Sequence, residues 1–278
     1  MKQYKVRSIL IQIPVRLALI FAASLIILPV AWVFLSAFKP EPHMMRYPPS
    51  FFPPEFTLDN FIKVQTRINI IRYMYNSLIY ALGTVIPALL VNSLAGYAFA
   101  RYQFKGRNAL FIIFLATMMI PFQVIMVPMF IVVHSLGFYN TYLGLIIPRI
   151  ASAYWVFFLR AAFFSLPKEL EEAARLDGLT EFGIYGRIMI PQIVPTLVTM
   201  TILSINGSWN DLLWPLLITS TARMRTIANG LALFTGVNSS EFGNAFAGCF
   251  LSLLPMFVLF IFAQKYFVKG QVLTGIKG

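Results

Sequence analysis

The most highly charged stretch of this chain is Glu169-Leu-Glu-Glu-Ala-Ala-Arg-Leu-Asp-Gly178, and five of the ten acidic residues lie between Glu169 and Glu181. Long apolar runs flank this stretch on both sides. A charged side chain at the centre of a bilayer costs about 2.5–3.5 kcal/mol even on a lenient scale. The stretch is therefore predicted to be a water-facing loop between two membrane-spanning segments.

The same stretch has the pattern of a short amphipathic helix. Ser165 is placed to cap it, and Pro167 suits the first turn, where no backbone donor is lost. Apolar residues follow at helical spacing, namely Leu166, Leu170, Ala173, Ala174 and Leu176. Asp177-Gly178 is predicted to end the helix, because glycine tolerates a left-handed backbone. Thr180 is then placed to cap a second helix that runs toward Pro191.

The composition of the whole chain is that of a membrane protein. Hydrophobic residues make up 59% of the 278 residues and charged residues 12%, with a mean hydropathy of +0.76. A net charge of +12 would suggest a nucleic-acid partner in a soluble protein. Here the basic residues cluster at the ends of apolar runs, which indicates membrane topology instead. Because the chain has only one cysteine and two histidines, a metal site is not expected.

The chain is predicted to be an all-α integral membrane protein with one transmembrane domain, residues 1–278. Its six predicted spans cover about residues 17–38, 76–100, 109–127, 143–164, 192–214 and 244–263. The first apolar run exceeds the roughly 7–15 residues of a signal-peptide core, so it is predicted to stay uncleaved. Both termini and the loops 101–108 and 165–191 hold 13 of the 22 basic residues and are predicted to be cytoplasmic. Basic residues usually mark the cytoplasmic side of a membrane protein, and loop 39–75 departs from this rule because it contains five Lys or Arg. It is nevertheless predicted to be external, as is loop 218–243.

Two charged residues fall within predicted spans and leave alternatives open. Arg149 could extend its side chain to the outer interface, which we favour, or could be a pathway contact or an inter-subunit ion pair. Asp211 lies about 20 residues into the fifth span, a depth near the far interface at 1.5 Å rise per residue. We favour an anchor and turn beside two tryptophans over a functional intramembrane acid.

Several kinds of chemistry have no motif in this sequence. Gly-Lys does not occur, so there is no phosphate-binding loop of the Gly-x-x-x-x-Gly-Lys-Ser/Thr type. No His-Glu-x-x-His, Gly-x-Ser-x-Gly or Gly-x-Gly-x-x-Gly pattern occurs either, and no catalytic residue is predicted. Intramembrane acids that could relay protons are nearly missing. The energy for any transport is therefore expected to come from a partner.

The charged loop carries a resemblance to a family. Glu172-Ala173-Ala174, Asp177-Gly178 and Ile190-Pro191 resemble the "EAA…G…LP" loop of permease subunits of binding-protein-dependent ABC importers. An ordinary interfacial helix would explain the charge pattern but not the full spacing. The resemblance implies the type I importer permease fold, with residues 165–191 as the coupling loop that docks on an ATPase.

Other stretches are similar to the carbohydrate-type, or maltose-type, subfamily of these permeases. They are Phe56-Thr-Leu-Asp-Asn-Phe61, Asn76-Ser77, Tyr97-Ala-Phe-Ala-Arg101, Phe104-Lys-Gly-Arg107, Trp209-Asn-Asp211, Trp214-Pro215, Tyr266-Phe-Val-Lys-Gly270 and Thr274-Gly-Ile-Lys-Gly278. They span nearly the whole chain. Ile190 stands where the family often has leucine, a volume-conserving change.

The resemblance implies a set of partners and residue roles. The partners are a second homologous permease, two ATPase subunits that use ATP and Mg²⁺, an extracytoplasmic solute-binding protein and membrane lipid. Coupling to the ATPase would rest on Glu172, Ala173, Ala174, Asp177, Gly178 and Pro191. Glu172 would offer a charge to the ATPase groove, the two alanines would allow close approach, and Gly178 would hold the bend. The location implied is the cytoplasmic membrane of a bacterium or archaeon.

Two points stay open at this stage. The competing function is an ATP-independent secondary carrier or a channel; a membrane scaffold has no positive support. The solute could be a sugar, a glycerol phosphate or another polyol. Asn206, Trp209 and Asn210 are candidate wall residues of the pathway, by polarity and aromaticity.

Overall fold

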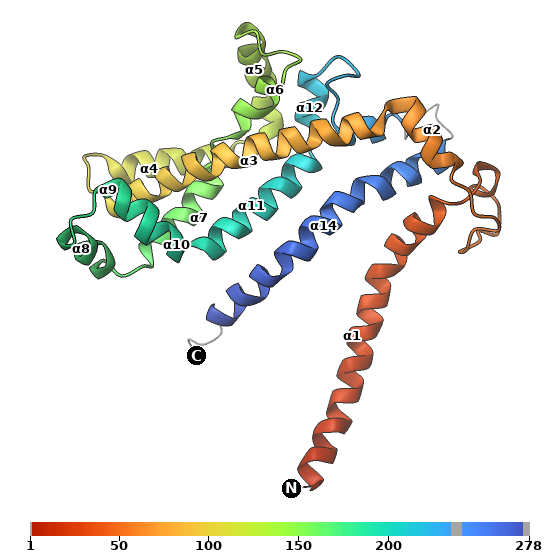
Figure 1. Cartoon of the computed structure of the whole chain (residues 1–278), viewed down its shortest axis with the longest axis horizontal. Helices are drawn as coiled ribbons and strands as arrows, with labels where there is room; N and C mark the ends of the chain where they lie inside the picture. Colours follow the sequence, from red (N-terminus) through yellow and green to blue (C-terminus); the bar gives the residue numbers. More distant parts are fainter. Residues whose placement is uncertain (1, 235–240, 275–278) are drawn as a thin grey trace. The chain divides into compact units, whose positions relative to one another are not determined.

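A computed structural model describes residues 2–234 and 241–274, with side chains described for residues 14–234 and 241–264. Over these residues the chain is helical and contains no strand, which confirms the predicted all-α class (Figure 1). Contacts divide it into two compact units. Unit 1 comprises Met1–Ile70 and Leu231–Leu254, and unit 2 comprises Ile71–Gly230 and Pro255–Gly278.

Unit 1 is built around an aromatic cluster. Its elements are α1 (Lys2–Ser36), η1 (Glu41–His43), α2 (Asp59–Ile68) and the beginning of α14 (Phe242–Thr274). The rings of Phe34, Phe38 and Phe61 lie 4.7–5.5 Å from that of Phe250. The Asn60 amide donates to the carbonyls of Ala37 and Lys39 at 2.9 and 2.7 Å, which satisfies acceptors left open after the end of α1.

The start of α14 is held by a carboxylate from the loop after α1. Glu41 accepts hydrogen bonds from the backbone N–H groups of Phe242 and Gly243, both at 2.8 Å. A negative charge at this position also stabilises the positive end of the helix dipole. The loop predicted over residues 39–75 is thus partly helical and is anchored within unit 1 as far as Ile70, where the next helix already begins.

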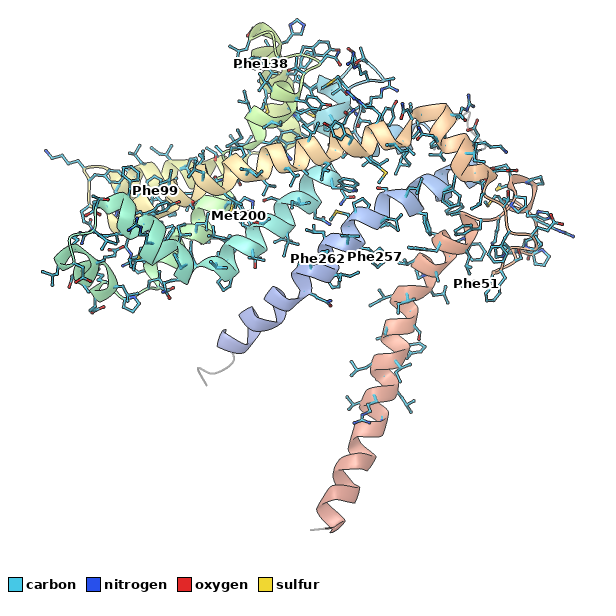
Figure 2. The ribbon with its side chains drawn as sticks, in the orientation of Figure 1. Phe51, Phe99, Phe138, Met200, Phe257 and Phe262 are labelled. Atoms are coloured by element: carbon cyan, nitrogen blue, oxygen red, sulfur yellow. The ribbon has the colours of Figure 1, made fainter. Side chains whose placement is uncertain are left out.

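Unit 2 contains most of the remaining helices. They are α3 (Ile70–Arg101), α4 (Arg107–Ala116), η2 (Thr117–Met119), α5 (Phe122–Ser135), α6 (Tyr142–Ile146), η3 (Ile147–Arg149), α7 (Ala153–Phe164), α8 (Glu169–Leu176), α9 (Glu181–Gly183), η4 (Ile184–Met189), α10 (Ile190–Gln192), α11 (Val194–Trp209), α12 (Leu213–Ile218) and α13 (Ile227–Ala232). α7 packs on α4 and α11. Phe99 of α3 packs against Phe111 of α4 with the rings tilted by 54° and their centroids 5.3 Å apart, and Met200 of α11 is fully buried (Figure 2).

Within the part of the chain that the structure describes, three helices are long and apolar enough to cross a membrane. They are Pro14–Ser36, Ile70–Arg101 and Phe242–Gln264. The other three predicted spans fall on helix pairs bent by 102°, 47° and 78°. The predicted third span, 109–127, is broken where Pro121 forces the preceding Ile120 into an extended backbone. The helix in the predicted fifth span, 192–214, ends at Trp209. The six membrane crossings remain a prediction.

One buried side-chain amide, that of Asn92, forms hydrogen bonds to backbone groups at the break in the predicted fourth span, 143–164. The Asn92 Nδ2 atom donates to the carbonyls of Ala88 and Ile150 at 2.7 and 2.9 Å, and its Oδ1 atom accepts from the N–H of Ser152 at 2.9 Å. Backbone groups exposed by a helix break at membrane depth must find partners within the protein. Asn92 supplies such partners to Ile150 and Ser152.

The segment predicted as a polar external loop, 218–243, is more ordered than expected. It contains α13, where Ile227 is buried and donates its backbone N–H to Ser77 Oγ at 2.8 Å. The Asn76 amide donates to the carbonyls of Arg223 and Arg225 at 2.9 and 2.7 Å. Asn76-Ser77 therefore anchors the first part of this segment to α3, while residues 235–240 lie outside the described part.

Residues between α9 and α10 form a π-helix, η4, rather than a continuous α-helix. A π-helix closes i→i+5 hydrogen bonds and so holds more residues per turn than an α-helix. Thr180 caps the short α9 ahead of it by accepting from the N–H of Gly183 at 3.2 Å, as the sequence predicted. The predicted second helix toward Pro191 is thus present, with a local widening.

Gly96 sits where α3 meets α7, and Gly96→Ala is expected to destabilise the protein by about 1–3 kcal/mol. A Cβ atom at this position would lie 2.8 Å from Leu159 Cβ and 3.0 Å from the backbone nitrogen of Arg160. Thermal unfolding in detergent measures the effect. Gly186→Ala is the control, because no atom lies within 4 Å of its Cβ position. Equal melting temperatures for the two variants would contradict close α3–α7 packing.

Candidate functional site

The charged stretch forms the helix that the sequence predicts. α8 runs over Glu169–Leu176, and Gly178 follows with φ +82°, the left-handed conformation expected at a helix end. Two details of the prediction are wrong. Pro167 precedes the N-cap residue of α8 and so lies outside its first turn. Ser165 ends α7 and donates to the Ala162 carbonyl at 2.8 Å, so it does not cap α8. Three acids in the first turn instead stabilise the N-terminus of α8 through the helix dipole.

One face of α8 is buried and holds an ion pair. Arg101, at the end of α3, places its Nε atom 3.3 Å from Glu171 Oε1, and the two side chains are only 5% and 7% exposed. Arg101 also donates to the Leu166 carbonyl at 2.7 Å. α8 is therefore fixed to the end of α3. The sequence did not predict that Glu171 is buried and paired with Arg101. Glu171 does share a helical face with Ala174, three residues later.

Ala174 lies on the same buried face, which corrects its expected role. It is 4% exposed and belongs to a core cluster with Phe163, Ile184 and Met189. Its surface is covered by its own chain, so it cannot allow close approach of another protein. It allows close approach of α8 to the core instead, because a larger side chain would not fit there.

The opposite face of α8 is open. Glu172 and Ala173 are exposed, and Leu176 is 90% exposed. Phe182 of α9 is 80% exposed as well. We call Glu172, Ala173, Leu176 and Phe182 the coupling surface. Two large apolar side chains beside a carboxylate are typical of a surface that another protein covers.

The turn between α8 and α9 is held by a network of exposed polar groups. Arg175 binds both carboxylate oxygens of Glu181, at 2.8 and 3.2 Å, and Tyr102 donates to the same carboxylate at 2.8 Å. The hydrogen bonds from Arg175 and then Tyr102 lower the pKa of Glu181. Such exposed pairs add little stability but fix geometry when the arginine is bidentate. Asp177 and Pro191, two further predicted site residues, are exposed on the same loop.

A polar cavity of about 380 Å³ lies within unit 2. Residues of α3, α5, α7, α11 and the η3 segment line it, and its polar side chains are Thr84, Arg149, Ser152, Ser204 and Ser208. The predicted wall residues Asn206, Trp209 and Asn210 are not among the lining residues. Asn206 and Asn210 are exposed, and Trp209 is buried. Ser204 and Ser208 are four residues apart and share a helical face that these three do not.

Arg149 and Asp211, the two charges within predicted spans, are brought together. Arg149 Nη2 lies 3.5 Å from Asp211 Oδ2, and the guanidinium stacks over the Phe122 ring at 4.4 Å. Tyr80 donates to the same carboxylate at 2.8 Å. The structure therefore gives Arg149 a partner within its own chain, and its predicted position at the outer interface stays a prediction. The pair joins two helix breaks within one chain, the first after η3 and the second between α11 and α12.

Asp211→Asn is expected to lower the free energy of unfolding by about 1–2 kcal/mol. Breaking a fully buried pair costs about 3–5 kcal/mol, and the Arg149 side chain, at 33% exposure, retains part of its solvation. The change would be measured as a shift in melting temperature in detergent. Asp59→Asn, at an exposed site in α2, is expected to change stability by less than about 0.5 kcal/mol. A smaller shift for Asp211→Asn than for Asp59→Asn would show that the pair does not stabilise the fold.

Among the described residues, no group of three or more His, Cys, Asp or Glu side chains is placed to hold a metal ion. The polar groups that line the cavity of unit 2 are instead hydroxyls and the guanidinium of Arg149. Such groups bind by hydrogen bonding. The arrangement thus offers a surface for a partner protein and a cavity for a polar solute, and neither contains a catalytic constellation.

Comparison with known proteins gives consistent results. Residues 92–272 match the family described as "Binding-protein-dependent transport system inner membrane component". The arabinooligosaccharides transport system permease protein AraQ of Halalkalibacterium halodurans is 39% identical, over 93% of this chain and 94% of its own. The lactose transport system permease protein LacG of Rhizobium radiobacter is 31% identical, over 90% and 91%. The trehalose/maltose transport system permease protein MalG of Thermococcus litoralis is 30% identical, over 93% and 94%.

Solved structures show the same fold. A chain from a bacterial ABC transporter involved in import of the acidic polysaccharide alginate has a TM-score of 0.80, with 22% identity over 93% of this chain and 96% of that chain. A second alginate transporter structure, in complex with an alginate pentasaccharide-bound periplasmic protein, has a TM-score of 0.63 and 17% identity. At these identities the likeness concerns the fold alone.

Proposed function

The chain belongs to the family of binding-protein-dependent transport system inner membrane components, and from this premise we propose that it is the permease subunit of an ABC importer for a sugar. With a second homologous permease it forms the pathway across the membrane. The relatives named above are permeases for arabinooligosaccharides, lactose and trehalose or maltose, which supports a sugar as solute. The whole chain acts as one transmembrane domain with six crossings.

The coupling surface is the observation that carries this proposal. Its open face presents Glu172 and Leu176 to a partner, while the buried face ties α8 to α3 through Arg101. The sequence has no phosphate-binding loop of its own. We assign ATP and Mg²⁺ to two separate ATPase subunits, each of which would receive such a helix in a groove. Movement of the ATPase would then reach the membrane helices directly.

An extracytoplasmic binding protein would deliver the sugar on the other side of the membrane. One solved neighbour was determined in complex with a periplasmic protein, which supports this partner. The segments 39–75 and 218–243 are the candidate contacts. This arrangement places both termini and the loop 165–191 in the cytoplasm of a bacterium or archaeon, in agreement with the charge distribution.

The test has two parts. The tagged protein is recovered from native membranes in mild detergent, and co-purifying proteins are identified by mass spectrometry; a second permease and an ATPase are expected. Uptake is then measured in cells for arabinotriose, lactose and maltose, with ATP depleted and a proton gradient maintained. Loss of uptake supports the ABC importer. Persistent uptake under this condition would establish the alternative, a secondary carrier or channel.

A further inference from the structure

The cavity in unit 2 contains a buried hydroxyl without a partner. Thr84 is 5% exposed and lines the cavity, and its Oγ1 atom has no hydrogen-bond partner among the described residues. Leaving a buried polar group unsatisfied costs about 1–3 kcal/mol. Rotation of the Thr84 side chain about χ1 would turn this hydroxyl toward the cavity, where a ligand could complete its hydrogen bonding. The hydroxyls of Ser152, Ser204 and Ser208 line the same cavity.

Arg149 adds oriented donors to this cavity. Its guanidinium is held by Asp211 at 3.5 Å and by the ring of Phe122 at 4.4 Å. A guanidinium has five N–H donors in a fixed plane, so these two contacts leave donors for a ligand. Because Asp211 balances its charge, the site attracts hydroxyl acceptors without attracting an anion. Among the lining residues Arg149 is the sole charged side chain.

Apolar groups complete the wall. The cavity is also lined by two aromatic side chains, Trp155 and Phe122, and by two aliphatic ones, Met129 and Ile125. The volume of about 380 Å³ lies within the roughly 300–1,000 Å³ of small-molecule sites, which combine apolar walls with a few placed polar groups. A sugar ring presents C–H groups on its faces and hydroxyls on its rim, so it matches both kinds of wall.

We infer that this cavity contacts an uncharged saccharide unit during transport, with Thr84, Arg149 and Ser204 as hydrogen-bonding residues. The inference rests on the proposed function and deepens it, because it names the class of sugar and the contacts. A uronate, which is a sugar with a carboxylate, is disfavoured because Asp211 already neutralises the charge of Arg149. The permease thus has its own selectivity for sugars, in addition to that of the binding protein.

The test uses the complete transporter reconstituted in liposomes, with tritiated arabinotriose loaded on its binding protein. Thr84→Val keeps the shape of the side chain and removes only the hydroxyl. We expect about tenfold less arabinotriose delivered per ATP hydrolysed, with ATP hydrolysis and melting temperature not reduced. The matched control is Thr199→Val on α11, whose hydroxyl donates to the Pro195 carbonyl at 2.9 Å and lies outside the cavity. Its delivery should equal that of the wild type.

Occupancy is measured separately with Ser204→Cys in a Cys249→Ser background. Arabinotriose is expected to slow labelling of this thiol by a maleimide about fivefold, by mass action at concentrations several times its Kd. Labelling of Thr199→Cys should not change. If the wild type delivers no arabinotriose, lactose and maltose replace it as probes.

Distinct outcomes overturn the inference and the proposed function. Equal delivery by Thr84→Val and Thr199→Val would overturn the inference, as would a parallel loss of delivery and ATP hydrolysis, which marks a structural role. ATP-driven uptake of an alginate trisaccharide in place of the neutral sugars would overturn the uncharged class and leave the importer intact. Uptake without ATP would overturn the proposed function itself.

Discussion

A transporter that carries Glu172→Lys is expected to take up sugar at least about a hundredfold more slowly, while its permease stays folded in the membrane. Glu172 is exposed on the open face of α8, so within the chain the change removes only its share of the helix-dipole stabilisation, about 0.3–1 kcal/mol. In the proposed complex it faces a basic groove of the ATPase. Like charges across an interface cost several kcal/mol, and about 2.7 kcal/mol corresponds to a hundredfold.

The measurement pairs sugar uptake with the amount of ATPase that co-purifies. Glu55→Lys is the matched charge reversal, at an exposed position of unit 1 outside the coupling surface, and is expected to leave both unchanged. Gly178→Asp is a second test of the same loop, because an aspartate at φ +82° strains the backbone by about 1–2 kcal/mol without any clash. Full uptake and normal ATPase recovery in Glu172→Lys would show that this surface does not couple.

The second large effect is expected at the buried ion pair. Arg101→Met should lower the free energy of unfolding by about 3–5 kcal/mol, because it leaves the Glu171 carboxylate buried without its countercharge. The Leu166 carbonyl loses its donor in the same variant. Melting temperature in detergent and the yield of monodisperse protein measure the loss.

The double variant Arg101→Met with Glu171→Leu separates charge from packing. Replacing a buried pair by apolar side chains of similar size is often neutral, so the double variant should recover most of the lost stability. Equal melting temperatures for the single and double variants would show that the loss comes from packing. A single variant as stable as the wild type would show that the pair is solvated.

The local features of the loop 165–191 could be predicted because each depends on neighbours in sequence. Gly178 adopts the left-handed backbone, and Thr180 caps the next helix, as their residue types and spacing indicate. The all-α class also follows from composition. The prediction was wrong at Ser165 because α8 begins only at Glu169, with Lys168 in the N-cap position. Ser165 is the C-terminal cap of α7 instead.

The cavity and the ion pairs Arg101–Glu171 and Arg149–Asp211 could not be predicted, because they join residues far apart in sequence. Arg149 and Asp211 were each noticed as a charge in an apolar run, but nothing local indicates that their helices meet. Asn206 and Asn210 were chosen by polarity alone; they are exposed and do not line the cavity that Ser204 lines, and their place on a pathway stays a prediction. Pro121 did indicate the helix break at Ile120, and the prediction of one span overlooked it.

The π-helix η4 has a consequence for how this chain can vary in length. A π turn is an α-helix that has gained a residue, so a one-residue deletion within Ile184–Met189 would restore an ordinary helix and leave the flanking residues facing as they do now. The same deletion in α8 would rotate the residues beyond it by about 100°, since an α-helix has 3.6 residues per turn. The coupling surface would then turn toward the core. Evolution can therefore add or remove a residue at η4 far more readily than a few positions earlier.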